Sequence, residues 1–417
     1  MTQLNRFKNT LASKNFDAAI ISSELNQRYL CDFPFSDGYI LVTQEKSYII
    51  TDFRYEEAIK KAVTDFEIIC PENSRIDCIV ELLSASKAKY TAVEEDSISL
   101  SEFNIFSKKL ENITTLREGA SELLLSQRAI KLDYEIERIK KAQSITDSAF
   151  SYIISFISQN KNSITERDIA LELDYFMQKH GAESPAFETI AVSGDASSLP
   201  HGVPRNEKLK SGFLTMDFGA KYNGYCSDMT RTIVIGKADE EIKNVYNTVL
   251  LAQKTALEQI RGSMPCRDAD AIARNIIENA GYKKAFGHSL GHGVGMFIHE
   301  KPNLSPRSAP ELLLQGGNVV TVEPGIYLEG KFGCRIEDMI LINTDGSVYN
   351  FTESIKDLIG KEDILLELKN KYNLEYYLER VPLLINDETY QKLSLDDDII
   401  EFMYKSKTKD DLDYHLH

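Results

Sequence analysis

Residues 215–235 read TMDFGAKYNGYCSDMTRTIVI. The Asn223-Gly224 pair inside this stretch is a strong signal for a two-residue β-hairpin turn. With those residues at the turn, Asp217 and Asp228 are offset by two positions from a directly facing pair, so they are diagonal neighbours on one face, about 7–8 Å apart at Cα. Two carboxylates on one face repel each other unless a cation lies between them, although solvated hairpin acids are the plainer alternative.

A second stretch, residues 286–302, reads FGHSLGHGVGMFIHEKP and concentrates histidine. It holds His288, His292 and His299, whereas the whole chain has 7 histidines. The interspersed glycines allow the backbone to turn sharply and to approach a bound group closely. Neutral imidazole is the commonest metal ligand in proteins. A loop with core histidines is the alternative, but glycine-flanked histidines pack poorly as core.

Two further segments each carry one acid in an apolar context. Residues 318–328 read NVVTVEPGIYL, and Glu323 ends their apolar strand before the Pro-Gly turn. Residues 334–342 read CRIEDMILI and place Glu337 within a strand, with Arg335 on the same face. A carboxylate within such a strand is disfavoured unless it meets a positive group, so the acids are expected to converge on one.

This set of four carboxylates and one histidine has the composition of a metal site. Oxygen-rich ligands favour harder divalent ions, with Mn²⁺ first and Co²⁺, Fe²⁺ or Zn²⁺ as alternatives. Four carboxylates carry too much negative charge for one divalent ion. The sequence therefore predicts two ions that share bridging carboxylates.

Upstream of these motifs, residues 1 to about 115 alternate apolar runs with helical patterns. β-Branched and aromatic runs predict strands, and the segments between them predict helices. The expected strands are 17–22, 38–43, 46–51, 66–70 and 90–95, and the expected helices are 54–63 and 75–86. We assign residues 1–130 to an N-terminal α/β domain.

From residue 135 onward the order of elements repeats. Apolar spacing predicts helices at 135–160, after an N-cap at Thr165, at 240–260 and at 266–281, and strands at 213–235, 318–323, 332–343 and about 348–351. Helix, helix and strands occur twice, which suggests a duplicated α/β domain around a shared sheet at 131–360. The fold class is thus α+β. Residues 361–417 are acidic and tyrosine-rich, and we expect a helical C-terminal extension there.

The composition limits the classes of function. The chain has 417 residues, 42% hydrophobic and 27% charged, which are globular values. A net charge of −16 argues against a nucleic-acid or membrane-surface footprint. No apolar run predicts a signal peptide or a membrane span, and the 6 scattered cysteines suit reduced thiols, so a cytoplasmic protein is expected. Cys226 and Cys334 lie near the acids; we interpret them as buried thiols, with a thiolate ligand as the alternative.

Taken together, the motifs resemble the methionine-aminopeptidase-like superfamily of dinuclear metallopeptidases, whose fold is called pita-bread. Within it they are similar to the Xaa-Pro peptidases, aminopeptidase P and prolidase. The resemblance covers residues 1 to about 360. Its motifs are SLPHGVP (198–204), MDFGAKYNGYCSDMTRT (216–232), GHSLGHGVGMFIHEKP (287–302), TVEPGIY (321–327) and RIED (335–338).

The resemblance implies a role for each matching residue. The metal ligands would be Asp217, Asp228, His292, Glu323 and Glu337. His201 and His299 would bind substrate and assist catalysis, while His288 would lie near the substrate and Arg335 near the last glutamate. The implied reaction is hydrolysis of an Xaa-Pro bond by a hydroxide that bridges two metal ions, with Glu323 as proton shuttle. Proline-containing peptides are the implied partners, and a homodimer the implied assembly.

Three hypotheses for the function remain open. A Xaa-Pro aminopeptidase accepts longer peptides, whereas a Xaa-Pro dipeptidase closes its site around two residues. In a prolidase we expect an arginine shortly before the TVEP strand, but between residues 302 and 323 only Arg307 occurs, rather early, which favours the aminopeptidase. A metal-free creatinase-like enzyme or binding protein is disfavoured because all five ligands are present. The N-terminal α/β domain disfavours a methionine aminopeptidase.

Overall fold

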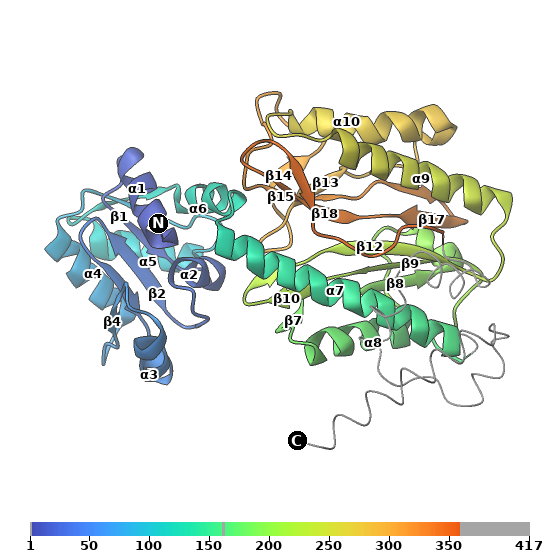
Figure 1. Cartoon of the computed structure of the whole chain (residues 1–417). Coiled ribbons are helices and arrows are strands. Elements are labelled where there is room, and N and C mark those ends of the chain that lie inside the picture. Colours follow the sequence, from blue (N-terminus) through green and yellow to red (C-terminus); the bar gives the residue numbers. More distant parts are fainter. Residues whose placement is uncertain (1, 161–162, 359–417) are drawn as a thin grey trace, which may run out of the picture. The chain divides into compact units, whose positions relative to one another are not determined.

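The computed structural model describes residues 2–160 and 163–358 (Figure 1). The helical extension expected at 361–417 lies outside the described residues. In the described part, no helix combines the length and apolar character needed to cross a membrane.

The N-terminal elements surround a six-stranded mixed sheet in the order β4-β3-β2-β1-β5-β6. Its strands are β1 (Ala18–Ile21), β2 (Tyr39–Thr43), β3 (Ser47–Ile50), β4 (Glu67–Ile69), β5 (Tyr90–Val93) and β6 (Thr115–Glu118). The helices are α1 (Gln3–Ser13), α2 (Glu24–Cys31), α3 (Phe53–Ala62), α4 (Arg75–Ser86) and α5 (Leu100–Leu110). The five strands and two helices expected here are confirmed. The edge strand β6 was not expected, because its TLRE sequence is largely exposed and carries no apolar run.

The rest of the described chain contains the duplicated order of elements. Helix α6 (Ala120–Ala129) ends the N-terminal region. The first half of the duplicated region then comprises α7 (Asp133–Asn160), α8 (Glu166–Lys179), β7 (Ser184–Pro185), β8 (Ile190–Ser193), β9 (Gly212–Phe218), β10 (Ala220–Tyr222), β11 (Tyr225–Cys226) and β12 (Met229–Ile235). The second comprises α9 (Glu240–Gln259), α10 (Cys266–Ile277), β13 (Gly291–Gly293), β14 (Glu300–Leu304), β15 (Val319–Val322), β16 (Gly325–Leu328), β17 (Phe332–Arg335), β18 (Asp338–Ile342) and β19 (Val348–Asn350). The four helices predicted after residue 130 correspond to α7, α8, α9 and α10. At α8, Thr165 caps the helix through a reciprocal pair with Asp168.

The central hairpin has the predicted register, since Tyr222 faces Tyr225 and Asp217 faces Thr230. It is nevertheless interrupted, and its two ends belong to different sheets, β11-β10-β7 and β12-β9-β8. The break lies at Gly219, where an added Cβ would be 1.9 Å from the carbonyl oxygen of Ser227. Asp228 therefore lies just before β12 rather than within a strand.

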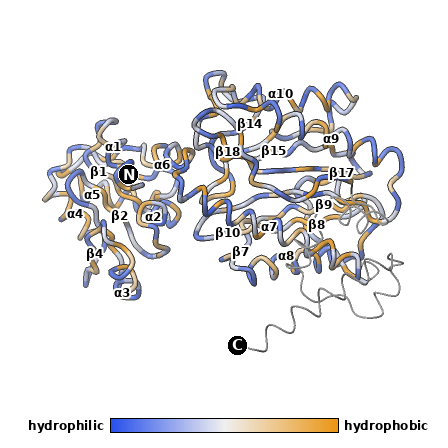
Figure 2. The backbone as a smooth tube through the Cα atoms, in the orientation of Figure 1, coloured by the Kyte–Doolittle hydropathy of each residue, from blue (hydrophilic) through white to orange (hydrophobic). Residues whose placement is uncertain are grey.

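The prediction of one shared sheet is wrong in its hydrogen bonding. The two halves form separate sheets, β12-β9-β8 and β14-β13-β15-β18-β19. They meet where the Glu337 amide donates to the Thr230 carbonyl at 3.1 Å, and Glu337 lies in the break between β17 and β18 instead of inside a strand. Helices α7 and α8 lie on one side of these strands and α9 and α10 on the other (Figure 1). The strands β15 and β18 are buried throughout, and Figure 2 shows the apolar residues along the central strands.

A buried polar cluster connects the N-terminal elements to β14. The side chain of Glu300 is fully buried and accepts from Arg128 at 2.9 Å and from Lys131 at 3.3 Å. Arg128 also donates to the side-chain oxygen of Asn26 in α2. The carboxylate thus receives both of its cations from residues near the end of α6.

Candidate active site

One cavity of about 490 Å³ collects every residue that the motifs singled out for function. Nine such residues line it: His201, Asp217, Asp228, His288, His292, His299, Glu323, Arg335 and Glu337. They come from strands and loops of both halves of the duplicated region. The fold therefore brings together side chains that lie more than one hundred positions apart in the sequence.

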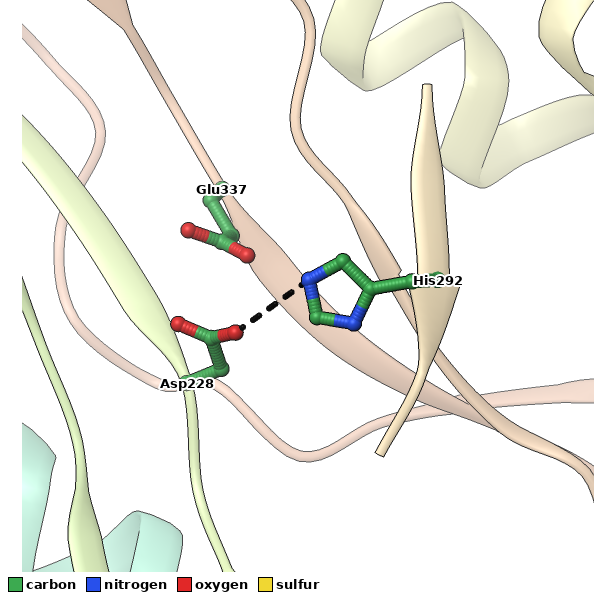
Figure 3. Close-up of side chains that lie close together, drawn as sticks. All are labelled: Asp228, His292 and Glu337. Atoms are coloured by element: carbon green, nitrogen blue, oxygen red, sulfur yellow. Dashed lines mark ion pairs between the residues drawn. The ribbon is translucent and has the colours of Figure 1, made fainter. Parts of the chain in front are cut away.

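Three of these residues form a cluster with the geometry of a metal site. The ligand atoms of Asp228, His292 and Glu337 all lie within 4.8 Å of one another (Figure 3). His292 projects from β13, while the two acids project from the breaks before β12 and before β18. Its Nε2 atom is 3.6 Å from an Asp228 oxygen and 3.4 Å from an oxygen of Glu323.

The hydrogen bonding of His292 directs one of its ring nitrogens toward the acids. Its Nδ1 atom lies 3.1 Å from the Gly293 carbonyl, which assigns the proton to Nδ1 and leaves the lone pair of Nε2 directed at the acids. Burial lowers the pKa of His292, so the ring is neutral. A neutral imidazole with a fixed tautomer is the form that binds divalent ions.

The clustered carboxylates are held in an unfavourable electrostatic environment. Burial, together with the charges of Glu337, Asp217 and Glu323, raises the pKa of Asp228 well above its usual value. Burial and the neighbouring acids likewise raise the pKa of Glu337. For Glu323, burial raises the pKa to about 8 although Arg335 opposes the change. A cation among these groups would reverse the repulsion.

In the described part of the chain, one side-chain oxygen of Asp217 has no hydrogen-bond partner. Its Oδ2 atom accepts from Arg335 at 2.6 Å, whereas Oδ1 is buried and has no hydrogen-bond partner within the described residues. An unpaired buried anionic oxygen is costly. Because it belongs to a residue that lines the cavity beside the other acids, it suits a divalent ion, and the residues present fit such ions.

Two threonines that were not predicted from the sequence motifs orient the acids. Thr230 Oγ1 donates to Glu337 Oε2 at 2.6 Å and accepts from Arg335 Nε at 2.9 Å. Thr321 Oγ1 donates to Glu323 Oε1 at 3.1 Å. A signal for Thr321 existed, since residues two apart on a strand share a face. For Thr230 the hairpin register gives only its position opposite Asp217.

Tyr327, also missed, fixes His288. Its hydroxyl accepts from Arg335 at 2.7 Å and lies 3.0 Å from His288 Nε2, to which it donates. The other ring nitrogen is 2.8 Å from the Ser289 carbonyl. Burial, helped by the charge of Arg335, lowers the pKa of His288 to about 3, so the ring is uncharged and locked.

His201 and His299 differ from the half-buried His288 and His292 because both are exposed. His201 lies in the loop after the 3₁₀ turn η1 (Gly194–Ser198), and the ring centroid of His299 is 4.4 Å from that of His292. Within the described residues neither ring makes a side-chain hydrogen bond. Both rings are thus available to a molecule bound in the cavity.

The two cysteines near the acids do not line the cavity. Cys226 is buried and donates to the Met296 carbonyl at 3.7 Å, and burial raises the pKa of its thiol to about 12. Cys334 is also buried, and burial raises its pKa as well. These surroundings favour the interpretation of both as buried thiols.

Comparison with known proteins covers nearly all of the described chain. Residues 137–344 match the Metallopeptidase family M24, and residues 3–130 match the Creatinase/Prolidase N-terminal domain. An Xaa-Pro dipeptidase of Pyrococcus horikoshii is 38% identical over 351 residues, which are 83% of this chain and 95% of that protein. The structure of an Xaa-Pro dipeptidase from Bacillus anthracis has a TM-score of 0.80 at 37% identity, covering 85% of this chain and 98% of the other. An X-Pro aminopeptidase from Thermotoga maritima has a TM-score of 0.78 at 35% identity, covering 85% and 99%.

Proposed function

Because the chain belongs to the Metallopeptidase family M24, and is therefore a hydrolase, we propose that it is an Xaa-Pro aminopeptidase, which removes the first residue of peptides with proline in second place. The main observation in favour of an aminopeptidase over a dipeptidase is the scarcity of positive charge in the cavity wall. Arg335 is the only lysine or arginine among the lining residues of the described chain, and Asp217 already engages it.

The proposed metal ligands are Asp217, Asp228, His292, Glu323 and Glu337, holding two divalent ions, with Mn²⁺ favoured over Co²⁺, Zn²⁺ and Fe²⁺. When bound, such ions polarise the substrate carbonyl and lower the pKa of bound water. The unpaired Asp217 oxygen and the triad of Asp228, His292 and Glu337 support this assignment.

The other steps of the reaction are assigned to side chains of the cavity. Glu323, oriented by Thr321, would take the proton of the attacking water and pass it to the departing proline nitrogen. His201 and His299, exposed at the cavity and without side-chain hydrogen-bond partners in the described chain, would donate to the carbonyl oxygen as negative charge develops there. We assign His288 and Arg335 to substrate binding and to the shape of the cavity wall.

The length of the peptide substrate distinguishes an Xaa-Pro aminopeptidase from an Xaa-Pro dipeptidase. A dipeptidase must hold a free proline carboxylate, and a cation is the natural partner for it. Arg307 is exposed and does not line the cavity, so Arg335 is the one arginine of the described chain in the cavity wall. The names of two of the relatives favour the dipeptidase, which therefore stays as the second candidate.

Product analysis with Arg-Pro-Pro and with Xaa-Pro dipeptides in Mn²⁺ tests the choice. The aminopeptidase is expected to release arginine from the tripeptide at least as fast as it cleaves a dipeptide, and to act poorly on peptides without proline in second place. If only dipeptides are hydrolysed, the dipeptidase is correct. Arg307, or an arginine of a second subunit, is then the carboxylate anchor to substitute.

Assembly and compartment follow as parts of the same proposal. We propose a homodimer with an N-terminal domain at 1–130 and a catalytic domain at 131–360. We also propose that it acts in the cytoplasm. The six cysteines are all free, which suits a reducing compartment.

A further inference from the structure

Behind the cavity lies an arginine whose hydrogen-bonding capacity is completely used. Arg231 is in β12, its side chain is 1% exposed, and it does not line the cavity. A guanidinium has five N–H donors in a fixed planar fork. Each has an acceptor here: the carbonyls of Thr230 (2.9 Å), Glu337 (2.5 Å), Ser354 (2.8 Å) and Ile355 (3.0 Å), and Asp338 Oδ1 (2.8 Å).

The proposed ligand Glu337 is held at three points by this strand. Its amide donates to the Thr230 carbonyl at 3.1 Å, and its carbonyl accepts from Arg231. Its carboxylate accepts from Thr230 Oγ1 at 2.6 Å. Because Arg231 Nη1 binds the carbonyls of Thr230 and Glu337 together, it fixes the separation of the two chain segments. The position of the carboxylate depends on that separation.

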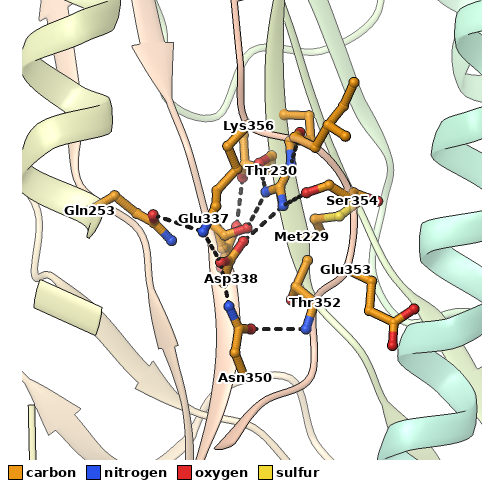
Figure 4. A network of polar contacts seen from close by, with 12 residues as sticks. Met229, Thr230, Gln253, Glu337, Asp338, Asn350, Thr352, Glu353, Ser354 and Lys356 are labelled. Carbon is orange, nitrogen blue, oxygen red and sulfur yellow. Dashed lines mark hydrogen bonds and ion pairs between the residues drawn. The ribbon is translucent and has the colours of Figure 1, made fainter. Parts of the chain in front are cut away.

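Asp338 extends the same cluster toward a second proposed ligand. It is fully buried, and its carboxylate accepts from Arg231, from Asn350 at 2.8 Å and from Lys356 at 2.5 Å (Figure 4). In the sheet, Asp338 pairs with Val322, the residue before Glu323. The ion pair between Arg231 and Asp338 therefore fixes the backbone next to Glu337 and next to Glu323.

The segment after β19 completes the cluster from outside the two sheets. The carbonyls of Ser354 and Ile355 accept from Arg231, and Lys356 also donates to Gln253 of α9 at 3.2 Å. Asp147 of α7 accepts from the Ser354 amide at 2.9 Å. Helices on both sides of the sheets thus secure the segment that binds Arg231.

We propose that Arg231 is a positioning residue for the metal centre, acting through Glu337 and Asp338. The proposal rests on the metal-binding function above. Arg231 does not line the cavity, so it would act without contacting substrate or metal. It places the Glu337 carboxylate at the distance that Asp228 and His292 require. Residues that orient metal ligands in this way typically change affinity by about 10–100-fold when replaced.

The decisive variant is Arg231→Lys, which keeps the charge but offers a single nitrogen with three donors and cannot span five acceptors. Metal-free wild type and variant are titrated with Mn²⁺ by calorimetry. The variant is expected to bind Mn²⁺ at least about tenfold more weakly. Its kcat is expected to fall while KM changes little, and excess Mn²⁺ is expected to restore part of the kcat.

A stability control separates positioning from general damage. Leu83→Ala opens a cavity in the N-terminal core, far along the chain from the metal ligands. It should lower the melting temperature without changing Mn²⁺ affinity. If Arg231→Lys does not fold, Lys356→Met takes its place, because that side chain is 17% exposed and its loss removes one of the three donors that hold the Asp338 carboxylate in place for Arg231. This variant is expected to weaken Mn²⁺ binding by about threefold, below the range for a directly orienting residue.

Each outcome has one meaning. Wild type that binds no divalent ion overturns both the proposed function and this inference. Wild type that binds Mn²⁺, next to a folded Arg231→Lys or Lys356→Met variant of equal affinity, overturns this inference alone. Weaker binding in those variants, with Leu83→Ala unchanged, supports it.

Discussion

The guanidinium of Arg335 and the carboxylate of Asp217 form a buried ion pair with a separation of 2.6 Å. The pair uses only one oxygen of Asp217 and leaves Oδ1 buried without a partner in the described chain. Arg335 thereby orients the acid while its second oxygen remains available. This arrangement suits a ligand that is aligned by a neighbour before an ion binds.

Removal of metal should abolish activity. Because we propose that the acids around Asp228 and Glu337 hold the metal ions, chelator-treated protein is expected to lose hydrolysis of Xaa-Pro peptides. Addition of Mn²⁺ or Co²⁺ should restore it, as followed by release of the N-terminal residue. Full activity in protein shown by elemental analysis to be metal-free would contradict the dinuclear mechanism.

Replacement of His201 should separate catalysis from metal binding. His201→Ala removes a proposed donor to the developing oxyanion, so turnover is expected to fall on the order of 10²–10³-fold. Metal content should stay at the wild-type level, because His201 is not among the proposed ligands. His180→Ala, an exposed histidine at the end of α8, is the matched control and should leave both quantities unchanged. Loss of metal from His201→Ala would reassign the residue.

The metal-free protein should become less stable as pH rises. Burial raises the pKa of Glu323 to about 8, from an ordinary value of 4.5. Between these values the folded state binds more protons than the unfolded state, so the free energy of unfolding falls with increasing pH. The melting temperature of metal-free protein is therefore expected to be lower at about pH 8 than at about pH 6. Glu323→Gln should make this dependence less steep without abolishing it, because Asp228 and Glu337 contribute with the same sign. An equally steep slope in that variant would refute the assignment.

The buried pair between Arg128 and Glu300 should matter far more than its exposed neighbour. Arg128→Met leaves the fully buried Glu300 with Lys131 as its remaining cation, and breaking such a pair costs about 3–5 kcal/mol. Lys301→Met removes an ion pair with Glu122 whose side chains are 43% and 60% exposed, so it should cost less than about 1 kcal/mol. Urea unfolding measures both values. Equal losses would mean that Glu300 is solvated in solution.

The sequence was most informative where periodicity or turn chemistry acts locally. The Asn223-Gly224 turn predicted the hairpin register through to Asp217 and Thr230. The break at Gly219 could not be predicted, because it depends on a close approach to Ser227 that no spacing encodes. The same limit explains why one continuous sheet was expected.

In the candidate site, too, some residues could be predicted from the sequence and others could not. The acids and histidines stood out because charged groups in apolar strands and glycine-flanked imidazoles are unusual. Thr230, Thr321 and Tyr327 did not stand out, because threonine and tyrosine are ordinary strand residues. Their roles become visible only through hydrogen bonds between distant segments.

The placement of Glu300 also has an evolutionary consequence. Its carboxylate is in the strand that begins directly after His299, yet both of its cations come from residues 128–131. A gene fragment that encoded only the later residues would inherit a buried charge without Arg128. The two regions are therefore expected to descend together, and recombination between them should be tolerated only when the cation and the carboxylate are exchanged as a pair.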